Sequence, residues 1–172
     1  MWLDQLLIEL NRCGTKGQSA VRFLNENGIH VILHDQPTAA RWTLNGQIQL
    51  HPRYALGLPS EPYPLSLVVH EVKHLQQGLF TALSVYGEVE AWQLQFSFIK
   101  TLTGRYHSNS HSDAILIELM SLEWGMDRSV LHRASILMKA YAGKNYLINL
   151  LPLYLCRKKF NSISSENRVD IF

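Results

Sequence analysis

The segment LVVHEVKHLQQGLF, Leu67–Phe80, contains two histidines four residues apart, His70 and His74, with Glu71 directly after the first. Its other residues are apolar enough for a buried helix. On an α-helix, residues four apart lie on the same face, one turn above the other. The two imidazoles can therefore bind one metal ion, while Glu71 lies about 100° around the helix and can face a water molecule held on that ion.

This HExxH pattern is typical of hydrolytic zinc sites. Zinc binds neutral imidazole and lowers the pKa of a bound water molecule to about 7, so that hydroxide is available at neutral pH. Glu71 would then take the proton of that water as a general base. A five-residue pattern also arises by chance, and the alternative interpretation is a core helix that carries two unrelated histidines.

A third ligand is expected in the next predicted helix, because a catalytic zinc site has three protein ligands and one open position. The segment YGEVEAW, Tyr86–Trp92, supplies the carboxylates of Glu88 and Glu90. The interval after His74 is long enough for the first helix to end, turn and present the start of an antiparallel helix. Both carboxylates fall in the first turn of that helix, so the spacing leaves Glu90 as an alternative ligand to Glu88.

The HExxH of residues 70–74 is followed by an ExxA element, residues 88–91. Together these two elements resemble the gluzincin branch of the zincin metallopeptidases. The HLQQG of residues 74–78 is also similar to small prokaryotic gluzincin-like families. The resemblance implies that Glu88 is the third zinc ligand and that the small Ala91 lets the two helices pack closely.

The resemblance also implies a zincin-like fold over about residues 29–104. In that fold a short sheet precedes the metal helix, and its edge strand, here near Ile48, binds the substrate backbone. A histidine or tyrosine outside the motif is implied as the hydrogen-bond donor to the developing oxyanion. Tyr106 and His107 are the candidates, because a polar loop after the helix of Glu88 can return toward the metal.

The whole sequence predicts an α+β fold in a single domain, residues 1–172. Helical spacing of apolar residues predicts helices over residues 2–13 and 19–28, with the glycine-containing segment between them as a break. Extended segments over residues 29–35 and 41–52 predict a small antiparallel sheet.

Helices are predicted for most of the chain that follows the sheet. Pro62 and Pro64 are placed where the metal helix begins, as proline favours the first helical turn. Beyond the second metal helix we expect a helical extension over about residues 112–160 and a flexible tail over residues 161–172.

Composition argues against several classes of function. The net charge is +2 and the basic residues are scattered, which does not indicate nucleic-acid binding. No apolar run is long enough to span a membrane, and no signal peptide is evident. The two cysteines lack a CxxC spacing. A cytoplasmic location is therefore expected. Charged residues make up only 17% of the chain, so we expect a peptide or protein substrate, another partner or a second copy in a homo-oligomer to cover apolar surface.

The predicted function is that of a zinc-dependent metallopeptidase, with Zn²⁺ held by the two motif histidines and Glu88, and with Glu71 as the catalytic base. The alternative is a non-catalytic, metal-stabilised sensor or protein-binding module on the same scaffold. The two differ at the fourth metal position. It is open to water in a peptidase and filled by a further protein ligand, such as His107 or Glu90, in the alternative.

Overall fold

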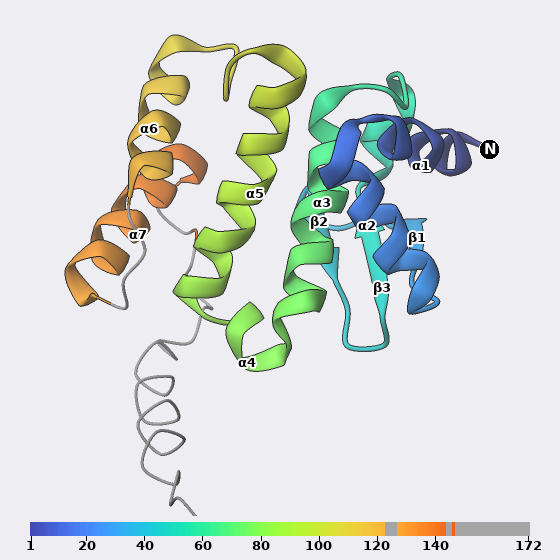
Figure 1. Cartoon of the computed structure of the whole chain (residues 1–172), viewed down its shortest axis with the longest axis horizontal. Helices are drawn as coiled ribbons and strands as arrows, with labels where there is room; N and C mark the ends of the chain where they lie inside the picture. The colour runs from blue at the N-terminus through green and yellow to red at the C-terminus, as the bar shows by residue number, and fades with distance from the viewer. Residues whose placement is uncertain (123–126, 144–145, 147–172) are drawn as a thin grey trace, which may run out of the picture.

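Helices dominate the computed structural model, which describes residues 1–122, 127–143 and 146 (Figure 1). The predicted α+β class is confirmed, while residues 147–160 of the predicted extension and the predicted tail lie outside the described residues. Within the described ranges, no helix has the length and apolar character needed to cross a membrane. In chain order the elements are α1 (Trp2–Arg12), α2 (Gly14–Glu26), β1 (His30–Leu33), β2 (Ala40–Trp42), β3 (Gln47–Leu50), the 3₁₀ helix η1 (Pro52–Leu56), α3 (Pro62–Gln77), α4 (Leu79–Ala82), α5 (Val85–Thr103), α6 (Ser110–Ser121) and α7 (Arg128–Ala142).

The sheet is mixed, so the prediction of an antiparallel sheet was wrong. Its strand order is β1-β3-β2, with β1 parallel and β2 antiparallel to the central β3. After β1 the chain reverses into β2 and reverses again into β3, which inserts between the two earlier strands. Two reversals leave β1 and β3 parallel. Ile48 lies on the central strand, paired with Val31 and Trp42, so the prediction of an edge strand near Ile48 was also wrong.

The two N-terminal helices meet at a close contact that requires glycine. Helix α2 begins at Gly14, so the predicted break between the two helices is itself mostly helical. A Cβ atom added at Gly17, inside α2, would lie 2.0 Å from the carbonyl oxygen of Leu10 in α1. Side chains of α1 and α2 pack with the sheet and α3 into a first hydrophobic core.

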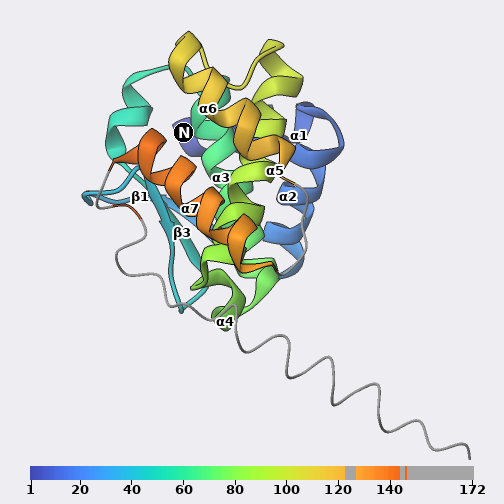
Figure 2. The same ribbon diagram turned by 90° about the vertical axis from the view of Figure 1, so that its left-hand side faces the viewer.

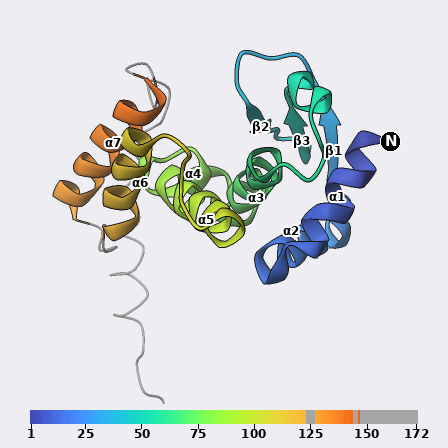
Figure 3. The same cartoon turned by 90° about the horizontal axis from the view of Figure 1, so that it is seen from above.

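Helices α3 and α5 lie side by side at the centre of the molecule (Figures 1 and 3). Helix α3 begins at Pro62, as predicted, and ends before Gly78, which has a φ of +73°. It is buried on almost all sides, because the sheet and α2 cover one side and α5 covers another. Helix α5 begins after Ser84 and ends at Gly104.

The far side of α5 is covered by α6 and α7 (Figures 2 and 3). These three helices form a second hydrophobic core, whose buried members are Val89, Trp92, Phe96, Ile99, Leu116, Leu119, Ala134, Leu137 and Met138. Phe98 of α5 belongs instead to the first core. Helix α5 therefore contributes to both cores, and its N-terminal end lies between them.

Candidate metal centre

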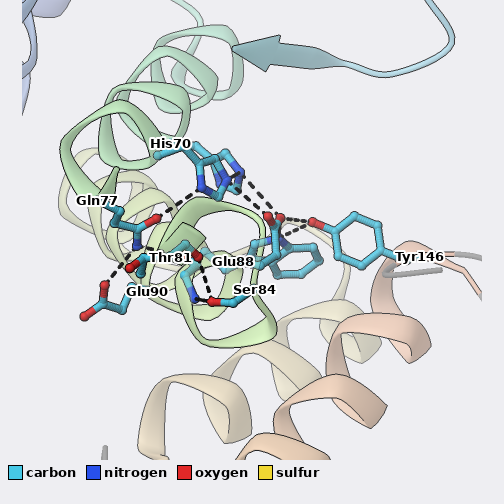
Figure 4. A network of polar contacts seen from close by, with 10 residues as sticks. His70, Gln77, Thr81, Ser84, Glu88, Glu90 and Tyr146 are labelled. Carbon is cyan, nitrogen blue, oxygen red and sulfur yellow. Dashed lines mark hydrogen bonds and ion pairs between the residues drawn. The ribbon is translucent and has the colours of Figure 1, made fainter. Parts of the chain in front are cut away.

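Three buried side chains converge between α3 and α5 (Figure 4). The two histidines come from successive turns of α3 and the carboxylate from the first turn of α5. Nε2 of His74 lies 2.9 Å from Nε2 of His70 and 3.1 Å from Oε2 of Glu88. Nε2 of His70 lies 3.5 Å from the other carboxylate oxygen, Oε1 of Glu88. The structure thus brings together the three side chains that the sequence pattern selected.

The spacing of these atoms fits a divalent metal ion. Ligand atoms about 2.1 Å from a tetrahedral centre lie about 3.4 Å from one another. The two imidazole nitrogens are 2.9 Å apart, and each has a different carboxylate oxygen of Glu88 nearby, at 3.1 Å and 3.5 Å. One ligand atom from each of the three residues lies within 4.8 Å of the other two. In the part of the chain that the structure describes, no second group of three such side chains is found.

The alternative ligand Glu90 lies outside this cluster, because residues two apart point to nearly opposite sides of a helix. Its Oε2 accepts a hydrogen bond of 2.9 Å from Nε2 of Gln77 and lies 3.4 Å from Nζ of Lys73. Its Oε1 accepts a hydrogen bond of 2.9 Å from the hydroxyl of Tyr86. Of the two carboxylates in this turn, the structure places Glu88 with the histidines.

A tight corner between α4 and α5 sets the position of Glu88. Ser84 caps α5, and its Oγ accepts a hydrogen bond of 3.0 Å from the backbone N–H of Gly87. A Cβ atom added at Gly87 would lie 2.0 Å from the carbonyl oxygen of Thr81 in α4. Only glycine lets the first turn of α5 approach α4 so closely, and the next residue is the candidate ligand.

Gln77 fixes the ring of His74. Its side-chain Nε2 donates to the carbonyl oxygen of Gly87 and to Glu90, so its Oε1 is left as an acceptor. That oxygen lies 3.2 Å from Nδ1 of His74, and we assign the ring proton to Nδ1. Nε2 then carries the free lone pair that a metal ion needs.

The charges of the three candidate ligands suit a cation. Burial lowers the pKa of His70 to about 4, which keeps this imidazole neutral at neutral pH. Burial opposes ionisation of Glu88, but its hydrogen bond with His74 and the two nearby imidazoles outweigh burial and lower its pKa to about 2. Burial also acts to lower the pKa of His74, yet contact with Glu88 raises it overall, so protons compete more strongly with a metal ion for this ring than for a free imidazole.

Glu71 lines the same cavity as the three candidate ligands. Burial raises its pKa to about 7; the nearby His74 opposes the rise and the carboxylate of Glu88 adds to it. The backbone of Trp42, in strand β2, also hydrogen-bonds the Glu71 carboxylate and favours its charged form. A carboxyl group with a pKa near neutrality can both accept and donate a proton at physiological pH.

In the metal-free protein, Glu71→Gln is expected to raise the free energy of unfolding at pH 8 by as much as about 3 kcal/mol, and much less at pH 4. The folded-state pKa is raised, so the stability that Glu71 contributes is fully present below its unfolded pKa and is lost as the pH rises through about 7. Glutamine stays neutral throughout. Urea unfolding of chelator-treated protein measures the difference. Glu118→Gln is the control, because Glu118 forms an ion pair with Arg133 on the surface. An equal effect of Glu71→Gln at both pH values would contradict this account.

A cavity of about 580 Å³ opens beside the candidate ligands. Strand β2 forms one wall, and among the described residues no other strand pairs with its outer edge. Helices α3, α5 and α7 form the others. The aromatic residues of its lining are Trp42, Tyr63, Trp92, Phe96, Tyr141 and Tyr146.

The two predicted oxyanion donors do not line this cavity. The hydroxyl of Tyr106 accepts a hydrogen bond of 3.2 Å from Nζ of Lys100, and the ring of His107 packs against Tyr141 with centroids 5.7 Å apart. The tyrosine that does meet the candidate ligands is Tyr146, whose hydroxyl donates to Oε1 of Glu88 (Figure 4). The sequence did not predict a role for Tyr146, since no local pattern links a residue beyond the end of α7 to a motif so far upstream.

Comparison of the chain with protein-family models, with curated proteins and with solved structures found no match. The site itself presents three converging donors, a buried carboxyl group beside them and a cavity in front.

Proposed function

We propose that the protein is a zinc-dependent metallopeptidase. The observation that carries the proposal is the cluster of two imidazole nitrogens and one carboxylate oxygen, which lie within 4.8 Å of one another beside a cavity that is also lined by Glu71. Neutral imidazole and carboxylate are ligands that zinc accepts. Three protein ligands leave the fourth position for water, which distinguishes a hydrolytic site from a structural one.

Zinc, when bound, would polarise the substrate carbonyl and make a water molecule more acidic. Glu71 accepts a proton from the water molecule as the oxygen of that water attacks the carbonyl carbon. The same carboxyl group then gives that proton to the nitrogen of the leaving amine as the peptide C–N bond breaks. Burial prepares Glu71 for both steps, because it disfavours the charged carboxylate and so makes it a stronger base than an exposed glutamate.

Strand β2 supports a peptide as the substrate. Its residues Ala40, Arg41 and Trp42 line the cavity, and its other edge is paired with β3. An extended peptide can hydrogen-bond to the unpaired edge of such a strand, which would lay its backbone across the front of the metal site. This assigns to β2 the role that the sequence placed near Ile48.

The experiment that tests the proposal is the zinc content of the purified protein, measured for the wild type, Glu88→Ala and Glu90→Ala. We expect about one zinc per chain in the wild type and in Glu90→Ala, and a loss of zinc in Glu88→Ala. Unfolding curves check that each variant is folded. A wild type that takes up no zinc would overturn the proposal. Loss of zinc from Glu90→Ala alone would exchange the roles of the two carboxylates.

A further inference from the structure

We propose that Trp92 and Tyr146 position Glu88, holding one of its oxygens so that it binds the metal through the other oxygen alone. This inference rests on the proposed function, since it concerns the third ligand of the same metal centre. It adds two residues that the HExxH and ExxA patterns do not contain. Both act through Glu88, and neither is itself a metal ligand or a catalytic residue.

The two carboxylate oxygens of Glu88 have different surroundings. Oε1 accepts a hydrogen bond of 2.9 Å from Nε1 of Trp92 and a second from the hydroxyl of Tyr146. Oε2 lies 3.1 Å from Nε2 of His74, and Oε1 lies 3.5 Å from Nε2 of His70. An oxygen that already accepts two hydrogen bonds is the poorer metal ligand, so these hydrogen bonds favour Oε2.

Trp92 is fixed where this role requires it. It lies one turn beyond Glu88 on α5, on the same face of the helix. Its ring is buried among three aromatic rings, Phe96, Tyr141 and Tyr146, at centroid distances of 5.4, 5.2 and 5.2 Å. The indole N–H is a donor only, and a buried N–H needs an acceptor. It therefore stays directed at Glu88 and at the hydroxyl oxygen of Tyr146, 2.6 Å away.

Tyr146 completes the arrangement from a distant part of the chain. It lies beyond the end of α7, where its backbone N–H donates to the carbonyl oxygen of Gly143. Its hydroxyl oxygen accepts from Trp92 and its hydroxyl proton goes to Glu88 (Figure 4). Hydrogen bonds of this kind around a ligand commonly change metal affinity by about 10- to 100-fold.

Binding through one oxygen matters because of the fourth position. If both oxygens of Glu88 bound the ion, the protein would supply four donor atoms, and the position that water must occupy would be crowded. With Oε1 held by the two aromatic side chains, the protein supplies three donor atoms. Trp92 and Tyr146 thus keep the centre open for a water molecule.

The test compares Trp92→Phe, Tyr146→Phe and the control Tyr141→Phe in the full-length protein. Tyr141 also packs on Trp92, but no hydrogen bond between it and Glu88 is found in the described part of the chain. Each protein is titrated with zinc to measure affinity. Each is also loaded with cobalt(II), whose visible absorption is intense in four-coordinate sites and weak in five-coordinate ones.

We expect Trp92→Phe and Tyr146→Phe each to weaken zinc binding about tenfold or more and to lower the cobalt absorption. Tyr141→Phe should change neither. Wild-type affinity and spectrum in both test variants would overturn this inference and leave the metal centre standing. A wild type that binds neither metal would overturn the proposed function together with it. Tyr146→Phe removes one hydroxyl group, so it decides the question if Trp92→Phe fails to fold.

Discussion

Glu71→Gln is expected to lower the rate of peptide hydrolysis about 10³-fold while zinc stays bound, because general bases commonly contribute 10²- to 10⁴-fold. Glutamine has nearly the same shape as glutamate but cannot accept the proton of the attacking water. The three candidate ligands are untouched, so metal content should equal that of the wild type. The loss of rate would therefore report on the proton transfer and not on the assembly of the site.

The rate can be measured before the natural substrate is identified. A mixture of peptides from denatured proteins is incubated with each variant, and new peptide ends are counted by mass spectrometry. Glu118→Gln is the control, since that glutamate lies on the surface of α6 and pairs with Arg133. Undiminished cleavage by zinc-loaded Glu71→Gln would show that another group is the base. Cleavage that persists after zinc has been removed from the wild type would point to a contaminating protease.

Gly87→Ala is expected to lower the free energy of unfolding by about 2 to 3 kcal/mol and to weaken zinc binding. Alanine in a helix would by itself stabilise the protein by about 1 kcal/mol relative to glycine. Here the added Cβ would lie 2.0 Å from the backbone oxygen of Thr81 and 3.0 Å from Oε1 of Gln77. Backbone atoms of α4 cannot rotate away as a side chain could, so the steric cost exceeds the helix propensity and the start of α5 must shift.

Gly17→Ala is the matched control for this prediction. Its Cβ would meet the carbonyl oxygen of Leu10 at the same distance, 2.0 Å, but in the N-terminal helical pair. We expect a similar loss of stability from urea unfolding, with zinc affinity unchanged. The contrast separates general destabilisation from displacement of Glu88. An increase in stability in either variant would mean that the helix tolerates the closer packing.

The helices and the pairing of the two histidines could be predicted because their signals are local. A spacing of four places His70 and His74 on one helix face regardless of what surrounds the helix. Pro62 and Gly104 mark ends of α3 and α5 by restricting or relaxing the backbone at those residues. Gly17 shows the limit of such signals. Its local sequence indicates a break, but it lies inside α2, where α1 approaches it too closely for any side chain.

Contacts between distant segments could not be predicted. The extended segment predicted over residues 41–52 turns between β2 and β3 and so belongs to two strands. Nothing local shows that β1 pairs in parallel with the far side of β3. The choice between Glu88 and Glu90 likewise depends on how the first turn of α5 packs on α4. Tyr146 meets Glu88 only because α7 packs along α5, and that packing is a property of the second core as a whole.

The three candidate ligands all come from α3 and α5, which are consecutive except for the short α4. Contacts between neighbouring segments form faster in folding than contacts between distant ones, because little loop-closure entropy is lost. This helical pair can therefore present all three donors before Tyr146, 58 residues beyond Glu88, arrives from beyond α7. During folding, the ion can therefore bind to a partly folded chain. The hydrogen bonds that restrict Glu88 to one oxygen then form after the ion has bound.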